Sequence, residues 1–165
     1  PGRTIQSDPP KRSPSPPRAQ VCQFTLKQIG RNRTTRLFAR AVHVSKEGTR
    51  GEPFDITAEG WIADYADPYD FVNVLLDGSN IHDSNNNNVA YFNDPTFNKQ
   101  MSAASLLSGA ARYSAYGNLD IKMMATNPPW AARNNANDRI RVSKHVGCYT
   151  YTAIYATDLA ALRLT

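Results

Sequence analysis

The sequence has few cysteines and no long apolar run, and both shortages narrow what the protein can be. Its 165 residues include only Cys22 and Cys148, so one disulfide at most can form. A disulfide between them is one alternative, but two unpaired buried thiols are the commoner outcome for cysteines without paired spacing. No run approaches the ~20 apolar residues of a membrane-spanning helix, and the N-terminus lacks the charged-then-apolar order of a signal peptide. We expect this segment neither to span a membrane nor to carry its own export signal.

Catalytic and metal-binding patterns are also scarce. The histidines His43, His82 and His145 are far apart, and from their spacing we predict no metal site of the zinc or iron type. No Gly-x-Ser-x-Gly elbow and no glycine-rich phosphate loop occurs. Glu59 and Asp64 differ in parity along an extended segment, so they are expected to point to opposite faces rather than share acid–base chemistry. The sequence therefore predicts neither an enzyme nor a cofactor.

Positive charge is in surplus. The formal net charge is +5 and the pI about 9.4. A nucleic-acid-binding domain would gather basic and aromatic residues on one folded face, and the candidate cluster is Arg31, Arg33, Arg36 and Arg40. We interpret this cluster as solvated surface charge, expect no nucleic-acid partner, and keep a basic nucleic-acid-binding domain as a third reading of the function.

The first eighteen residues differ from the rest in composition. They hold six of the eleven prolines, four basic residues and few apolar groups. Such a segment gains too little from burial to offset the entropy lost on ordering. We predict that residues 1–18 are a disordered proline-rich tail that packs on nothing.

The stretch from Phe54 to Phe71 is the most informative part of the chain. Residues 54–60 alternate in polarity, which predicts a half-buried strand. Its apolar face consists of Phe54, Ile56, Ala58 and Gly60. Asp64 follows the strand, where open α/β sheets tend to place ligand contacts. The stretch therefore has the character of a ligand-cleft wall.

Helix signals follow this stretch. Asp67 supplies an N-cap oxygen, Pro68 fixes the first φ, and Asp70 adds a negative charge in the first turn of the predicted helix. This helix should stop at Gly78. Asp94 and Pro95 repeat this start, and a second helix from Ser108 should complete an antiparallel hairpin. The inward faces of the hairpin are predicted to be Phe97, Met101, Ala104, Tyr116, Leu119 and Met123. The asparagine run at residues 85–88 is predicted to be a solvated turn.

The segments on either side complete the expected fold. Short helices are predicted over 19–30 and 40–46, with a strand at 32–38 between them that forms a βαβ-like unit with the strand at 54–60. The segments 130–135 and 139–143 are predicted to be strands. The alternation of strand-like segments of period two with helical segments predicts an α/β fold with a mixed sheet flanked by helices.

Four motifs follow one another in an order typical of one family. The run Gly60-Trp61-Ile62-Ala63-Asp64-Tyr65-Ala66-Asp67-Pro68 precedes Leu75-Leu76-Asp77-Gly78, Tyr91-Phe92-Asn93-Asp94-Pro95 and Gly147-Cys148-Tyr149. Over about residues 19–165 the chain resembles extracellular solute-binding proteins of family 5, the peptide- and nickel-type receptors of ABC importers. The resemblance implies an incomplete type II periplasmic-binding-protein-like lobe, the C-terminal part of a two-lobed receptor. Residues 19–128 would be a ligand-binding lobe segment, and 129–165 a hinge strand and return segment.

The same resemblance implies a function. The chain would be part of the substrate-binding component of an ABC importer, which binds a peptide or related small solute between two lobes and delivers it to a membrane permease. It would act outside the cytoplasm, in the periplasm or as a cell-surface lipoprotein, with the export signal on the missing N-terminal part. The alternative is a non-functional or interaction-only fragment of such a receptor.

Candidate ligand contacts also come from the resemblance. The aspartate of the Trp-x-Ala-Asp motif, Asp64, would receive the ligand's α-ammonium group, although an aspartate that only anchors its own loop is the alternative. Trp61 is either a cleft wall or ordinary core. The full predicted ligand-binding set is Trp61, Ile62, Ala63, Asp64, Arg133 and Asn134.

Overall fold

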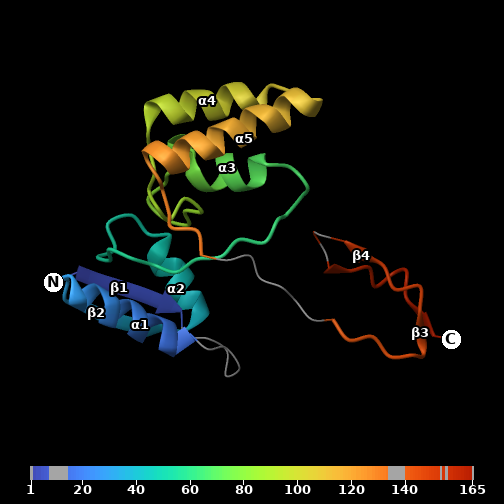
Figure 1. Ribbon diagram of the computed structural model, residues 1–165, viewed down its shortest axis with the longest axis horizontal. Helices are drawn as coiled ribbons and strands as arrows, with labels where there is room; N and C mark the ends of the chain where they lie inside the picture. The colour runs from blue at the N-terminus through green and yellow to red at the C-terminus, as the bar shows by residue number, and fades with distance from the viewer. Residues whose placement is uncertain (1, 8–14, 134–139, 153, 155, 165) are drawn as a thin grey trace.

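The N-terminal part of the molecule is a βαβ unit. The computed structural model describes residues 2–7, 15–133, 140–152, 154 and 156–164. Strand β1 (Gly2–Ser7) pairs in parallel with β2 (Arg33–Phe38), and helix α1 (Ser15–Gln28) makes the crossover between them. A parallel pair needs such a crossover, because a tight turn can join only antiparallel strands. Helix α2 (Arg40–Glu47) follows and contacts both strands (Figure 1).

Three helices form the second part. Helix α3 (Tyr69–Leu76) is followed by a short 3-10 turn, η1 (Gly78–Asn80), and by the hairpin of α4 (Pro95–Ser105) and α5 (Gly109–Thr126). Figure 1 shows α4 and α5 side by side above α3. The Asp94 carboxylate accepts hydrogen bonds from the backbone N–H groups of Thr96 and Phe97, which caps α4 as predicted.

The apolar core lies within this helical part. Among the described residues, the buried apolar side chains are Val72, Leu75, Leu76, Phe92, Phe97, Met101, Ala104, Tyr116, Leu119 and Met123. The six inward positions predicted for the hairpin are all in this core, so the helical periodicity is confirmed. Inside it, the Tyr116 hydroxyl donates to Asn73 Oδ1 at 2.7 Å, which satisfies both buried polar groups.

The C-terminal part contains only short ladders. Strand β3 (Val146–Gly147) pairs with β6 (Arg163–Leu164), and β4 (Tyr151–Thr152) pairs with β5 (Ala156–Thr157), both antiparallel. Figure 1 shows this part reaching away from the helices. In the described residues of 130–135 and 139–143, the predicted strands are absent. The alanines of the first segment have low strand propensity, and Pro128 and Pro129 precede them. The second segment alternates in polarity, but its described residues pair with no neighbouring strand.

The tail prediction is wrong where the structure describes the tail. Residues 2–7 form β1, and the end of the tail belongs to α1; residues 1 and 8–14 lie outside the described residues. The prolines are confined to positions 1 and 9–17, so the hexapeptide of β1 contains none, and composition averaged over eighteen residues hid it. Pro16 and Pro17 fall in the first turn of α1, where no N–H is needed. The division of the chain into three domains stays a prediction.

The strand predicted at 54–60 is also absent. An isolated bridging pair occurs at Ile56, and the flanking residues form no ladder. Phe54, Ile56 and Ala58 are half-buried and Asp55 and Glu59 are exposed, as the alternation predicts, but Thr57 is half-buried as well and Gly60 is exposed. Alternation does not supply a neighbouring strand, and a strand without one leaves its backbone groups unpaired. The observed βαβ unit is therefore β1–α1–β2, not the predicted one that ended in a strand at 54–60.

Helix α1 is longer than predicted, and its apolar face is largely uncovered. Within it Leu26 is half-buried, whereas Val21, Phe24 and Cys22 are exposed. Cys148 is exposed as well, and both cysteines are free thiols rather than the buried ones expected.

Candidate functional site

The loop at residues 61–64 is held by a buried carboxylate at the start of α3. Asp70 is 1% exposed, and its Oδ2 accepts hydrogen bonds from Trp61 Nε1 at 3.1 Å and from the backbone N–H of Asp64 at 2.8 Å. Its position in the first helical turn also favours a negative charge. Asp70 therefore fixes both ends of this short loop.

This arrangement bears on the two readings of Asp64. An aspartate that anchors its own loop would use its carboxylate to accept backbone N–H groups. In the structure Asp70 does this, and Asp64 takes part through its backbone N–H. The Asp64 side chain is exposed, and its carboxylate accepts no hydrogen bond in the part of the chain that the structure describes. The loop thus presents a negative group to solvent on a fixed backbone.

The other predicted contacts are less uniform. Trp61 is half-buried and packs against the core while its indole N–H reaches Asp70, so it supports the loop from the inside. Ile62 is 79% exposed and Ala63 is half-buried. Arg133 is exposed on the segment after α5, and none of the interactions described for the chain joins it to the loop. Asn134 lies outside the described residues.

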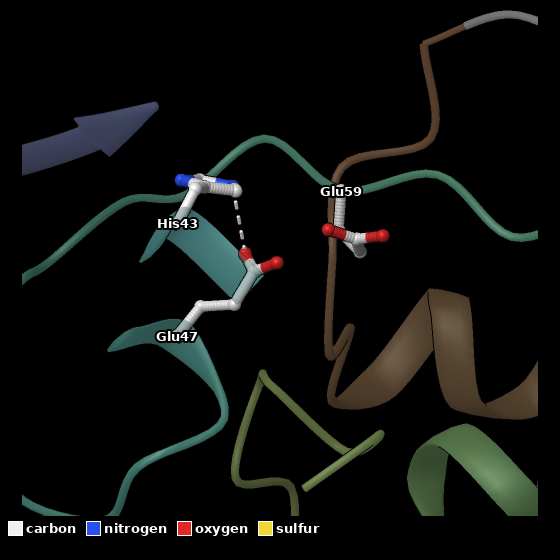
Figure 2. Close-up of side chains that lie close together, drawn as sticks. All are labelled: His43, Glu47 and Glu59. Atoms are coloured by element: carbon white, nitrogen blue, oxygen red, sulfur yellow. Dashed lines mark ion pairs between the residues drawn. The ribbon is translucent and has the colours of Figure 1, made fainter. Parts of the chain in front are cut away.

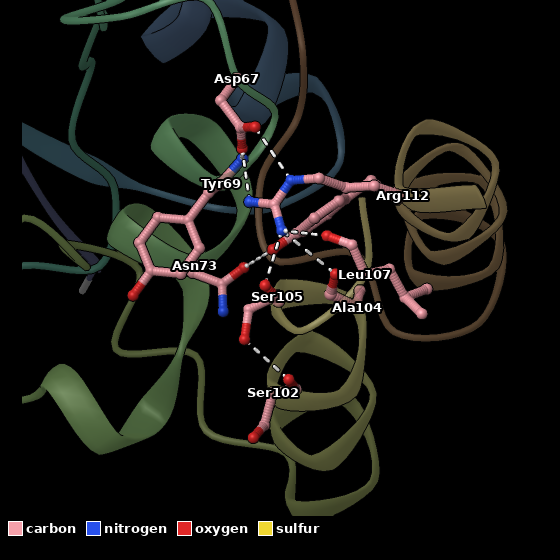
Figure 3. A network of polar contacts seen from close by, with 9 residues as sticks. Asp67, Tyr69, Asn73, Ser102, Ala104, Ser105, Leu107 and Arg112 are labelled. Atoms are coloured by element: carbon pink, nitrogen blue, oxygen red, sulfur yellow. Dashed lines mark hydrogen bonds and ion pairs between the residues drawn. The ribbon is translucent and has the colours of Figure 1, made fainter. Parts of the chain in front are cut away.

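A second polar network joins Asp67, which lies between that loop and α3, to the helical hairpin (Figure 3). Arg112 donates from Nε to Asp67 Oδ2 at 2.9 Å and from Nη2 to Asp67 Oδ1 at 2.7 Å. Its third nitrogen, Nη1, donates to the carbonyl groups of Ala104, Ser105 and Leu107 at the end of α4. This fork of hydrogen bonds lowers the pKa of Asp67. The network explains how two distant segments fix the start of α3.

Sequence reasoning gave Asp67 and Asp70 more limited roles. We predicted Asp67 as the N-cap, but Pro68 holds that position, and Asp67 accepts from the Tyr69 N–H at 2.8 Å while it binds Arg112. Asp70 was expected only as a first-turn charge, and no local pattern indicates that it reaches back to Trp61.

A different group of side chains meets between α2 and the segment that follows it. Figure 2 shows His43, Glu47 and Glu59 facing one another. His43 Nε2 lies 3.1 Å from Glu47 Oε2, and the Thr57 hydroxyl donates to the same oxygen at 2.7 Å. Burial lowers the pKa of His43, and burial followed by the neighbouring Glu59 carboxyl raises the pKa of Glu47 to about 8. At neutral pH both buried groups are therefore mainly uncharged.

The asparagine run holds this helix in place. Asn86 donates from Nδ2 to the carbonyl groups of Gly48 and His82, each at 2.8 Å, and the Tyr91 hydroxyl donates to the Glu47 carbonyl at 3.1 Å. Asn85 has the positive φ expected of the turn, at 59°. Asn86 and Asn88 are buried rather than solvated, so the run is structural and fixes the C-terminal end of α2.

The fold matches part of the fold of several solved binding proteins. No protein-family model matches the chain, and no curated protein sequence does. Among solved structures, the Helicobacter pylori periplasmic binding protein DppA in complex with peptide STSA has a TM-score of 0.63 and 20% identity over 74% of this chain and 23% of that one. The Bacillus subtilis oligopeptide-binding protein AppA, in complex with a nonapeptide, has a TM-score of 0.70 and 18% identity over 99% of this chain and 31% of that one. A dipeptide-binding protein from Pseudoalteromonas sp. SM9913, in complex with Met-Leu, has a TM-score of 0.70 and 21% identity over 99% of this chain and 32% of that one.

These likenesses confirm the resemblance at the level of fold. The chain spans about a quarter to a third of the length of each of these three structures, so it corresponds to a portion of such a protein. The three are named as binding proteins and not as enzymes, in line with the expectation from the sequence. Among the described residues, no helix is both long and apolar enough to cross a membrane.

Proposed function

We propose that the chain is part of the substrate-binding component of an ABC importer, and that Asp64 binds the amine end of a peptide or related small solute. The observation that carries the proposal is the exposed Asp64 carboxylate on a loop whose backbone Asp70 fixes from behind. An anchored loop keeps the carboxylate in place before the ligand arrives, which lowers the entropy lost on binding.

The ligand interaction is a charge-assisted hydrogen bond. An ammonium group that meets a carboxylate in a partly desolvated cleft contributes about 1.5 to 3 kcal/mol. Ile62 and Ala63 would contact the apolar part of the ligand, with Arg133 and Asn134 on the segment after α5. The chain spans 23 to 32% of the peptide-bound neighbours, so the opposing lobe would belong to the remainder of such a protein. The rest of the cleft would come from chain outside these 165 residues.

The cycle would be one of hinge closure. A ligand that contacts both lobes binds the closed form better than the open form and so shifts the population toward it. The membrane permease would recognise the closed form outside the cytoplasm.

The test compares three forms of the protein that carries this chain. Asp64→Asn keeps the size of the side chain and removes its charge, and Asp120→Asn makes the same change at an exposed position on α5. The probe is a tripeptide with a free N-terminus, chosen by native mass spectrometry from a mixed tripeptide library. By calorimetric titration, we expect Asp64→Asn to weaken binding at least about tenfold and Asp120→Asn to leave it unchanged.

Thermal unfolding of the same three proteins separates the two readings of Asp64. The proposal predicts that Asp64→Asn leaves the melting temperature unchanged, since no hydrogen bond of its carboxylate is described. An unchanged affinity together with a lower melting temperature would make Asp64 a loop anchor. If the wild-type protein captured no peptide or small solute, the chain would be an interaction-only fragment instead.

A further inference from the structure

The junction between α2 and the following segment gathers three side chains that metals favour as ligands. His43 and Glu47 lie one helical turn apart on the inner face of α2, and Glu59 approaches from the extended segment (Figure 2). One ligand atom from each residue lies within 4.8 Å of the other two. The sequence prediction of no metal site considered the spacing between histidines and overlooked the carboxylate four residues after His43.

The spacing of these atoms suits a small cation. Zinc bonds of about 2.0 to 2.2 Å in a tetrahedral arrangement place neighbouring ligand atoms about 3.3 to 3.6 Å apart. His43 Nε2 and Glu47 Oε2 are already 3.1 Å apart. A ligand atom of Glu59 lies within 4.8 Å of one on each of them, which is at most about 1.5 Å beyond the range of a tetrahedral site. Because Glu59 is exposed, it also gives an ion a path to two residues that are otherwise buried.

Burial gives the cluster a reason to accept a cation. Glu47 is 1% exposed and His43 is 2% exposed, and His43 Nδ1 has no hydrogen-bond partner among the described residues. A divalent cation would offset the negative charge of two neighbouring carboxylates, and an imidazole nitrogen favours a borderline metal such as Zn²⁺ over Mg²⁺ or Ca²⁺.

We propose that His43, Glu47 and Glu59 bind one divalent transition-metal cation of the zinc type. Three protein ligands leave a fourth position for water. Glu59 lies two residues before Trp61, so the bound cation would tie α2 to the segment that leads into the Asp64 loop. The proposed metal site shares no residue with the proposed ligand contacts.

The test is titration of Zn²⁺ into the chelator-treated chain, followed by calorimetry. Cys22 and Cys148 are exposed thiols that could bind zinc, so both are replaced by serine in every protein compared. The variants are Glu59→Gln, which changes an exposed ligand, and Glu47→Gln, which matches the shape of the protonated carboxyl. Asp120→Asn is the control for an exposed carboxylate elsewhere.

We expect one zinc ion per chain, at least about tenfold weaker binding in each glutamine variant, and no change in the control. Zinc should also raise the melting temperature of the parent and of the control, but not that of Glu59→Gln, because only a native-state ligand stabilises the fold. Absence of zinc binding in the parent would overturn the proposal. Equal zinc affinity in Glu59→Gln and the parent, with both folded, would overturn it as well, since the ion would then bind elsewhere.

Discussion

The helical part of the molecule and its N-terminal βαβ unit use apolar residues in opposite ways. The helices α3, α4 and α5 bury their apolar faces against one another, and Met101 at the centre is fully buried. Helix α1 leaves Val21 and Phe24 63% and 66% exposed, although it packs along β2. The helical part therefore has a core of its own, whereas the βαβ unit leaves apolar side chains on its surface. This difference accords with a chain that spans a third or less of its peptide-bound neighbours.

The strongest test of this difference is one substitution made in both regions. Phe97→Ala empties a site that is 4% exposed and should lower the free energy of unfolding by about 3 to 5 kcal/mol. Phe24→Ala removes the same side chain from the exposed face of α1 and should cost about 0.5 kcal/mol or less. Denaturant unfolding of both variants measures the contrast. Equal losses would show that α1 is packed as tightly as the hairpin.

A smaller effect distinguishes Asp64, in the 61–64 loop, from Asp70, on α3, which holds that loop. Asp70→Asn weakens both hydrogen bonds to Oδ2 by removing the carboxylate, and it puts an amide NH₂ without an acceptor in the buried position of Oδ1, so we expect a loss of about 1 to 3 kcal/mol. Asp64→Asn should change stability by less than about 0.5 kcal/mol. Tryptophan fluorescence would report the release of Trp61 in the first variant only. If Asp64→Asn lost more stability than Asp70→Asn, Asp64 would be the loop anchor and not a ligand contact.

The smallest effect is a pH dependence at the junction between the two regions. The folded-state pKa of Glu47 is raised from 4.5 to about 8, so its contribution to stability is present below pH 4.5 and is lost as the pH rises toward 8. The pKa of His43 is lowered from 6.5, so its contribution is lost as the pH falls below that value, and above pH 6.5 it no longer varies.

Between pH 6.5 and 8.5 the free energy of unfolding should therefore decline with pH through Glu47. Glu47→Gln keeps the shape of the protonated group and should flatten this decline, whereas Glu52→Gln, at a half-buried position that pairs with Lys46, should not. Metal-free buffer keeps the comparison clean. A decline of the same slope in Glu47→Gln would assign the titration to another group.

Helices were predictable from this sequence because their signals are local. The Asp94-Pro95 start and the spacing of Phe97, Met101 and Ala104 predict both the cap and the buried face of α4. The same holds for α2 and β2, whose ranges differ from the predictions by one residue at most at each end. Within such segments, capping and periodicity are set by neighbours three or four residues away.

Errors occurred where the outcome depends on distant residues. Whether 54–60 forms a strand depends on a neighbouring strand that this alternation does not provide, and β1 exists because β2 pairs with it. The anchoring role of Asp70, the pairing of Asp67 with Arg112 and the approach of Glu59 to His43 each join segments that periodicity treats separately. The candidate loop was predictable from its motif, but its support was not.

The most direct test of the account couples Asp64 to the ligand's amine. The affinity of one tripeptide and of its N-acetylated form is measured by calorimetry for the wild-type protein and for Asp64→Asn. If Asp64 receives the ammonium group, acetylation weakens binding to the wild type by at least about tenfold and has little further effect on Asp64→Asn, since both changes remove the same interaction. If acetylation weakens binding equally in both proteins, the amine is bound elsewhere and Asp64 is not its partner.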